Sequence, residues 1–434
     1  MIRWNYSVRI CFLAAVAALL MTAPAEIQSR EKKMEKTIQL NEKTTAVLDD
    51  PVVVATSKPG EKRWGYFQFP TLSALPGGKI LYTFNNQADA VSGYGNPVPG
   101  YISADNGKTW KKNTDSSVKT IAPHGVISEI FNGEYLCVYP TPALDAKKKG
   151  IRMPKPVAQM KSYCLHNFFR LSEFSQKFQK RQTCLPARRW TPEEKKWTES
   201  TVGYDPNGQL VLARAEGSDK DLLPRTWFED KVLRVNNELL YADYRCSFLL
   251  DDGSAPKNFS VVLMASTDNG KTFQRRSTIA SDPTGKDALS ESALSATSDG
   301  KLVCVIRRTD HEQKPMAITF SEDQGKTWTA LEDFCDYGVW PRLLLLDCGV
   351  MVLAYGRPGV ILRFSIDGKG RQWSEPYTLK KGVPGETNAA TCGYTFLHRL
   401  DSRSFLIAYS DFDYKDKNNK QRKALKVQKI SIRQ

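Results

Sequence analysis

The sequence predicts an all-β fold built from repeated antiparallel units. Two observations carry this prediction: one turn motif recurs along the chain, and apolar hairpin segments lie between its copies. Aromatic residues at 10% and hydrophobic residues at 41% are sufficient for a large core. Each repeat would therefore be a hairpin-based unit that buries its apolar face against its neighbours.

The recurring motif is an octapeptide that ends in an aromatic residue. It reads SADNGKTW at Ser103–Trp110, STDNGKTF at Ser266–Phe273 and SEDQGKTW at Ser321–Trp328, and a degraded copy stands at Ser365–Trp373. Asp and Ser side chains can hydrogen-bond nearby backbone amides, and Gly adopts the positive φ that a tight turn needs. The motif predicts a rigid turn after a strand, in which the Asp is structural rather than catalytic or Ca²⁺-binding.

The spacing of the copies predicts how many units the chain contains. They begin at residues 103, 266, 321 and 365, so the intervals are 163, 55 and 44 residues. Each of the two shorter intervals fits one four-stranded unit. The longest would hold three compact units, or two with an insertion, and the basic, proline-containing segment 147–196 favours two.

Apolar hairpins indicate the remaining repeated units. Four phrases place apolar residues on both sides of a Gly or Asp turn, as expected for paired strands: residues 72–82, 294–304, 343–352 and 396–407. With the octapeptides, they predict a six-bladed β-propeller of four-stranded blades. A strand within residues 37–48 would close the last blade by pairing with residues 424–432. Residues 26–434 would then form a single domain, expected to be a monomer because a propeller closes on itself.

The first 25 residues predict a cleaved signal peptide. Arg3 and Arg9 give a positive start, residues 10–21 are apolar, and Ala23-Pro24-Ala25 offers a small-residue cleavage site. The apolar run is too short to span a bilayer, and no later stretch is apolar enough. The protein is therefore expected in the periplasm, at the cell surface or outside the cell.

The charge balance predicts the kind of partner. Lys and Arg number 62 against 47 Asp and Glu, giving a formal net charge of +15, with clusters at residues 147–149 and 415–426. For an exported protein, a positive field favours acidic glycans over nucleic acid. The four His residues have no metal-ligand spacing, so neither a metal nor another cofactor is predicted.

The box S-x-D-x-G-x-T-W at blade spacing resembles the sialidase superfamily over essentially the whole chain after residue 25. Sialidases bind their substrate's carboxylate with three arginines, because guanidinium groups bind carboxylate in a bidentate way. The resemblance assigns the second to Arg307, after Glu291 and a turn, and the third to Arg357, eight residues before Ser365. The first would stand at Gln68, in Phe67–Leu72, so this chain departs from the family pattern there.

The same resemblance implies the catalytic groups. Tyr394, in Gly393–Leu397, would be the nucleophile, as in retaining sialidases, and Glu291 the base that assists it. A neutral phenol avoids repulsion from the substrate carboxylate. Asp89 would be the general acid, with His124 as an alternative. Structural roles are open for each of these positions: Tyr394 also reads as an ordinary strand aromatic, and Arg357 as a loop cation.

The resemblance implies an exo-acting glycoside hydrolase that releases a terminal acidic sugar. Gln68 in place of the first arginine argues against ordinary N-acetylneuraminate, and a uronic acid or a ketodeoxyaldonic acid would suit an amide donor. Two alternatives stay open. The protein would be a non-catalytic glycan-binding propeller if it lacks the acid, or a propeller polysaccharide lyase in which Tyr or His abstracts a proton.

Overall fold

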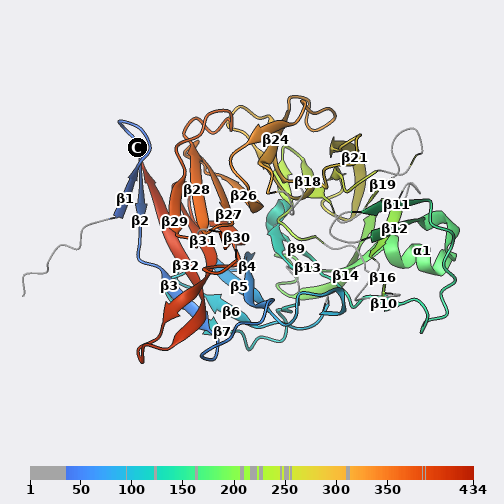
Figure 1. Cartoon of the computed structure of the whole chain (residues 1–434), viewed down its shortest axis with the longest axis horizontal. Helices are drawn as coiled ribbons and strands as arrows, with labels where there is room; N and C mark the ends of the chain where they lie inside the picture. The colour runs from blue at the N-terminus through green and yellow to red at the C-terminus, as the bar shows by residue number, and fades with distance from the viewer. Residues whose placement is uncertain are drawn as a thin grey trace, which may run out of the picture. The chain divides into compact units, whose positions relative to one another are not determined.

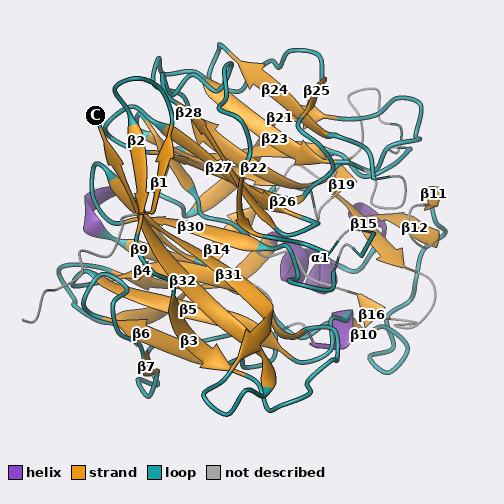
Figure 2. Ribbon diagram, turned by 60° about the vertical axis from the view of Figure 1, so that its left-hand side comes forward, coloured by secondary structure: helices purple, strands orange, loops and turns teal. Residues whose placement is uncertain are grey.

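The computed structural model describes residues 36–434 with internal gaps at residues 94, 122–124, 162–164, 206–209, 216–221, 224–227, 245–246, 249–253, 255–256, 309–312, 384 and 387. The predicted signal peptide and His124 lie outside the described residues. Within the described part, no helix is long and apolar enough to cross a membrane. The predicted all-β class is confirmed, because strands dominate the described residues (Figure 2).

Three sheets each contain four strands that are consecutive in the sequence and in space. The first comprises β4 (Tyr66–Leu75), β5 (Lys79–Asn86), β6 (Gly100–Ser103) and β7 (Lys111–Lys112). The second comprises β22 (Ser290–Ala296), β23 (Leu302–Arg307), β24 (Met316–Ser321) and β25 (Glu332–Phe334). The third comprises β26 (Val339–Leu345), β27 (Met351–Gly356), β28 (Val360–Ser365) and β29 (Tyr377–Lys380).

A fourth sheet joins the two ends of the described chain (Figure 1). Its strands are β1 (Lys36–Gln39), β2 (Thr45–Leu48), β3 (Val52–Thr56), β30 (Thr395–Arg399), β31 (Ser404–Lys415) and β32 (Gln421–Arg433). The antiparallel pairing of β2 with β32, from Thr45 opposite Arg433 to Leu48 opposite Ile430, confirms the predicted closing pair. The sequence did not predict that β3 also pairs with β32.

An eight-stranded sheet occupies the long interval between the first two boxes. One half contains β8 (Ile127–Glu129), β9 (Tyr135–Val138), β13 (Cys184–Trp190) and β14 (Trp197–Tyr204). The other contains β17 (Leu233–Val235), β18 (Glu238–Asp243), β20 (Val261–Ser266) and β21 (Thr272–Ala280). A short parallel pairing of β14 with β21 joins the halves. The sheet therefore divides into two groups of four strands, and the number of blades in this interval stays a prediction.

The predicted insertion is real but shorter than residues 147–196. Residues 184–190 form β13, whose backbone pairs with β9 and β14 in the main sheet. The inserted elements are β10 (Leu144–Asp145), β11 (Ala158–Lys161), β12 (Leu165–Arg170) and α1 (Gln176–Thr183). β10 pairs with β16 (Leu222–Leu223), and β12 pairs with β15 (Leu210–Ala215), which pairs in turn with β19 (Ser247–Phe248). In Figure 1 these elements lie beside the eight-stranded sheet.

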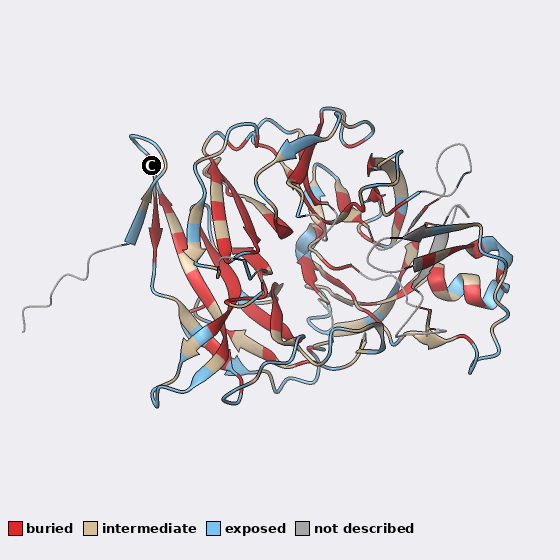
Figure 3. Ribbon diagram, in the orientation of Figure 1, coloured by how far each residue is buried: buried red, intermediate tan, exposed pale blue. Residues whose placement is uncertain are grey.

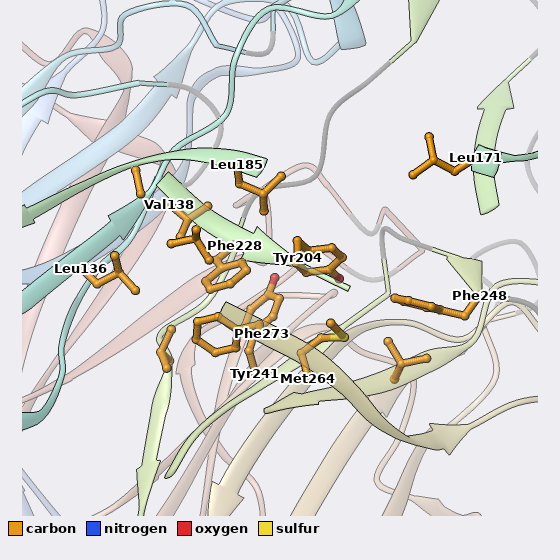
Figure 4. Packing of buried hydrophobic residues seen from close by; sticks show 14 of the residues in the cluster. Leu136, Val138, Leu171, Leu185, Tyr204, Phe228, Tyr241, Phe248, Met264 and Phe273 are labelled. Carbon is orange, nitrogen blue, oxygen red and sulfur yellow. The ribbon is translucent and has the colours of Figure 1, made fainter. Parts of the chain in front are cut away.

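The hydrophobic core lies between successive sheets, and the hairpin ends are exposed (Figure 3). One cluster joins the two halves of the eight-stranded sheet, where the Phe228 ring stacks on Tyr241 and meets Phe273 edge-on at centroid distances of 4.3 and 4.9 Å (Figure 4). Fully burying an aromatic side chain of this size is worth about 1.5–3 kcal/mol. The clusters therefore hold neighbouring sheets face to face.

The octapeptide boxes form the predicted turns. In the first, Ser103 Oγ accepts a hydrogen bond from the Gly107 amide at 2.9 Å, and Asp105 accepts two from Thr109 at 2.9 and 2.6 Å. Asn106 and Gly107 have φ angles of 57° and 83°. The copy at residues 321–328 makes the same bonds. The carboxylate of each box thus closes its own turn.

The first strands of successive four-stranded groups lie next to one another. β4 contacts β8, β17 and β18 contact β22, β22 contacts β26, β26 contacts β30, and β30 contacts β4. A hydrogen bond of 2.9 Å from the Val232 amide to Ser128 Oγ links β8 to the segment before β17. Residues at the starts of these strands are thereby brought together from distant parts of the sequence. The six-blade count itself stays a prediction.

Candidate active site

Tyr394 lies at the centre of a buried hydrogen-bonded group. Its phenol donates to Glu291 Oε1 at 2.7 Å, and Arg307 Nη1 lies 3.3 Å from the phenol oxygen and 2.5 Å from Glu291 Oε2. Glu291 and Arg307 are 8% and 5% exposed. The three residues come from β22, the end of β23 and the residue before β30. The structure therefore brings together three of the predicted site residues.

Near the starts of three strands, register shifts direct side chains toward Tyr394. Glu291 in β22 and Trp340 in β26 have φ angles of 34° and 39°, and both lie where the pairing register shifts. Phe69 in β4, with φ 53°, lies at a similar shift. Extra residues of this kind re-aim side chains, which in a regular strand would alternate between faces. The rings of Phe69 and Trp340 meet Tyr394 edge-on at 4.7 and 5.2 Å.

Trp340 also positions the carboxylate through its backbone. Its amide donates to Glu291 Oε2 at 3.0 Å, so that oxygen receives both a backbone hydrogen bond and the Arg307 ion pair. The other oxygen receives the Tyr394 proton. Glu291 thus accepts hydrogen bonds from three different residues, one of which is Tyr394.

Arg357 lies beside Tyr394 on a tightly packed backbone. Its guanidinium carbon is 5.4 Å from the centre of the Tyr394 ring and 5.5 Å from that of Trp64, and its Nε donates to the Cys392 carbonyl at 3.3 Å. Gly393, with φ 79°, passes so close that a Cβ there would lie 2.7 Å from Arg357 Cγ. A side chain at Gly393 would therefore displace the arginine.

The other two predicted residues occupy different surroundings. Asp89 is exposed, and its Oδ2 accepts from the Trp64 indole at 3.1 Å, so it is linked to the Arg357 environment through that ring. Gln68 is fully buried, and its Oε1 accepts from the Gly65 amide at 3.0 Å. Phe67 and Phe69, which flank Gln68, both have positive φ, so the regular alternation of side chains between the two faces of a strand does not hold here. The roles of Asp89 and Gln68 stay predictions.

The electrostatics keep the Tyr394 phenol protonated. Burial raises its pKa well above the ordinary value, and the negative charge of Glu291 adds to this, while Arg307 and Arg357 oppose it. At neutral pH the phenol is therefore neutral, and its hydrogen bond of 2.7 Å to Glu291 Oε1 places a carboxylate oxygen within reach of its proton.

Sequence reasoning missed several aromatic and charged residues of the site. Trp64, Phe69 and Trp340 surround Tyr394 and Arg357, yet nothing in their sequence context separates them from ordinary strand aromatics. Arg342 lies over the Trp340 ring at 4.6 Å and forms an ion pair of 2.5 Å with Asp230. Among the described residues, no group of three or more His, Cys, Asp or Glu side chains could hold a metal ion.

Comparisons with known proteins agree with this architecture. Residues 101–112 match the family model of the BNR/Asp-box repeat. An α-L-arabinanase from Penicillium chrysogenum, complexed with arabinobiose, shares 14% identity at a TM-score of 0.52, covering 88% of this chain and 98% of that chain. Leech intramolecular trans-sialidase shares 14% identity at a TM-score of 0.51, covering 88% and 70%. The chain has a sialidase-like fold.

A protein of unknown function from Dyadobacter fermentans has the same sialidase-like fold, with 18% identity and a TM-score of 0.57, covering 89% of this chain and 99% of that chain. The comparison with curated proteins found no match. Identities this low support the sialidase-like fold alone. The roles of individual residues must therefore be argued from the geometry around Tyr394.

Proposed function

We propose that this protein is a glycoside hydrolase whose active site is centred on Tyr394. The observation that carries the proposal is the hydrogen bond of 2.7 Å from its phenol to Glu291, with Arg307 in contact with both groups. A glycoside-hydrolase-like function is also supported by the shared fold, since the arabinanase and the trans-sialidase are carbohydrate-active proteins by their names.

The six consecutive four-stranded groups would be the blades of a propeller. This reading is supported by the cyclic order in which the first strands contact one another, from β4 through β30 and back to β4. Loops and strand starts at such a hub are a frequent place for ligand sites, because side chains from every blade converge there. Tyr394, Glu291 and Arg307 would face this hub.

The reaction would proceed in two steps. Tyr394 attacks the anomeric carbon while its proton passes to Glu291 Oε1, and Asp89 protonates the departing glycosidic oxygen. Water then attacks the anomeric carbon, Asp89 takes a proton from that water, and the departing Tyr394 oxygen regains its proton from Glu291. Arg307 stabilises the developing charge, because it contacts both the phenol oxygen and the carboxylate.

The substrate would be a terminal acidic sugar on a glycan outside the cell. Arg357, whose position beside Tyr394 suits a carboxylate on the reacting sugar, supports this choice. One observation favours a second candidate, a neutral sugar such as arabinose. Arg307 is already ion-paired with Glu291, and Gln68 stands in place of an arginine, so less positive charge faces a substrate than three arginines would supply.

The test is product formation by the purified protein on a panel of sialosides, ketodeoxyoctonate oligosaccharides, uronic-acid-capped polysaccharides and arabino-oligosaccharides. Release of one terminal monosaccharide without new ultraviolet absorbance supports the hydrolase and names its sugar. A new absorbance from a double bond would instead identify a lyase. Binding without any product would identify a glycan-binding protein.

Two substitutions then test the assigned roles. Glu291→Gln should lower kcat/KM by about 100-fold to 10,000-fold, because it removes the proton acceptor, and Tyr394→Phe should lower it at least as much. Tyr377→Phe, on the outer strand β29, is the matched control and should leave activity within about two-fold. Activity of Tyr394→Phe near that of the unmodified protein would exclude Tyr394 as the nucleophile.

A further inference from the structure

A cavity lies in the inserted region, and none of the residues assigned to the reaction lines it. Its volume is about 1300 Å³, and it is lined by α1, by the segment 149–157 that follows β10, and by the start of β13. Pockets for drug-sized ligands occupy roughly 300–1,000 Å³. The cavity could therefore hold a ligand of several sugar units.

The lining of this cavity is strongly positive. One carboxylate, Glu173, is present among six cationic side chains, which are Lys149, Arg152, Lys155, Lys177, Lys180 and Arg181. Among the described residues, none of these six forms an ion pair with a carboxylate. Like charges gathered around a hollow repel one another, so this arrangement attracts an anion from solution.

Arg181 adds an observation of a different kind. Its Nη2 donates to the Pro142 carbonyl at 3.4 Å, whereas its buried Nη1 has no hydrogen-bond acceptor among the described residues. Burial lowers the pKa of this guanidinium, which reflects the cost of removing its charge from water. A buried donor without an acceptor is unfavourable, and an anionic group in the cavity would supply the missing acceptor.

We propose that this cavity is a binding site for an anionic oligosaccharide that carries carboxylate or sulfate groups, separate from the site at Tyr394. The lining favours a glycan over nucleic acid, because its aromatic residue Phe178 is only 5% exposed and offers no face on which a base could stack. The cavity is concave, so the flat surface of a lipid bilayer cannot reach its lining. The choice of a glycan as the anion rests in part on the proposed function.

The test is calorimetric binding of a sulfated hexasaccharide and of hexagalacturonate to the purified protein, with neutral maltohexaose for comparison. The anionic sugars should bind and the neutral one should not. Raising the ionic strength from about 0.05 M to about 0.5 M should weaken binding, because salt screens exposed charges. Tighter binding of a single-stranded DNA oligonucleotide or of anionic vesicles would overturn the assignment to a glycan.

Two matched variants locate the binding. The triple variant Lys149→Glu, Lys155→Glu, Lys177→Glu reverses three exposed cations of the cavity and should weaken binding by about ten-fold or more. The control Lys415→Glu, Lys417→Glu, Lys420→Glu makes the same charge change on the exposed C-terminal hairpin and should keep the affinity within about two-fold. An equal loss in both variants would mean attraction by net charge and would overturn the proposal.

A third variant separates the cavity from the reaction. Arg357→Ala removes a cation beside Tyr394, so it should impair hydrolysis while leaving calorimetric binding of the anionic hexasaccharides unchanged. Loss of that binding would place the ligand at Tyr394 and overturn the second site. A protein that binds these sugars at the cavity but hydrolyses none of the glycan panel would contradict only the proposed function.

Discussion

Backbone angles at individual residues indicate how the site is held. Glu291, Trp340 and Arg357 have φ angles of 34°, 39° and 71°, in a region that side chains other than glycine rarely adopt. Each such residue costs about 1–3 kcal/mol, and persists only where the surroundings fix it. All three are at least nine-tenths buried among strands of different sheets. The surrounding core therefore holds these three residues in the positions from which they contact Tyr394.

Two adjacent arginines provide a residue-scale prediction. Arg307 contacts Glu291 and Tyr394, whereas Arg308 forms ion pairs with Asp287 at 3.6 Å and Asp333 at 2.8 Å. If the proposed reaction is right, Arg307→Gln should reduce kcat/KM by about 100-fold or more, because it removes the buried charge in contact with Glu291 and Tyr394. Arg308→Gln should change it by less than about two-fold. If steady-state kinetics show the same loss of kcat/KM in both variants, Arg307 has no special role in the reaction.

Two glycines provide a second prediction at this scale. Gly393 and Gly349 have φ angles of 79° and 87°, so alanine is strained at both, by about 1–2 kcal/mol. Only at Gly393 would the new Cβ meet a neighbour, Arg357, since nothing lies within 4 Å of a Cβ at Gly349. Gly393→Ala should thus lower both stability and kcat/KM, whereas Gly349→Ala should lower stability alone. Thermal unfolding of the two variants measures the backbone strain, and their kcat/KM values show whether Arg357 is displaced.

The boxes act at the scale of single elements. Each joins two strands of one sheet through bonds made by its own Ser, Asp, Gly and Thr, so the turn needs little help from the rest of the molecule. Hydrogen bonds from Thr109 and Thr327 lower the pKa values of Asp105 and Asp323 to about 2. The folded protein thus favours the ionised form of both carboxylates.

These pKa values predict a pH dependence of stability. An aspartate whose folded pKa is depressed stabilises the fold fully above its ordinary pKa, and this contribution is lost as the pH falls through about 4 towards about 2. The double variant Asp105→Asn/Asp323→Asn should therefore lose less stability over that pH range than the unmodified protein does. Urea unfolding at a series of pH values measures this loss. Glu42→Gln, an exposed carboxylate outside the boxes, should reproduce the unmodified decline. Identical curves for all three proteins would contradict a role for box ionisation.

At the scale of the whole molecule, β32 connects the two ends of the described chain. It pairs with β31 on one side and with β2 and β3 on the other, so contacts of the longest sequence separation depend on it. Ile430, near the C-terminal end of this strand, is fully buried in the cluster that contains Ala46 and Leu48. Loss of this packing should weaken the closure rather than a single hairpin.

The corresponding prediction compares two isoleucines of the same sheet. Ile430→Ala should lower the free energy of unfolding by about 2–5 kcal/mol, because it leaves a cavity in the packed core. Ile38→Ala, on the edge strand β1 and only partly buried, should cost about 1 kcal/mol or less. Both are measured by urea unfolding. Similar losses at the two positions would show that β1 contributes as much to closure as β32.

The sequence by itself determined the local architecture. The box turns, the hairpins at residues 72–82 and 396–407, and the pairing of the N-terminal strand with the C-terminal one all follow from residues close in sequence or from matching apolar strands. The resemblance also assigned a substrate-binding role to Arg307; the structure pairs Arg307 with Glu291, and that role stays a prediction. These features depend on turn-forming residues and on the pattern of apolar residues, and both can be recognised within a short stretch of sequence.

Only the tertiary structure decided how the site is assembled. Alternation along a strand predicts which way a side chain faces only while the strand is regular, and β4, β22 and β26 are irregular where they approach Tyr394. The places of Gln68 and Trp340, and the cavity beside α1, depend on packing between segments far apart in the sequence. A register shift is stabilised by neighbours on other strands, and no short stretch of sequence contains those neighbours.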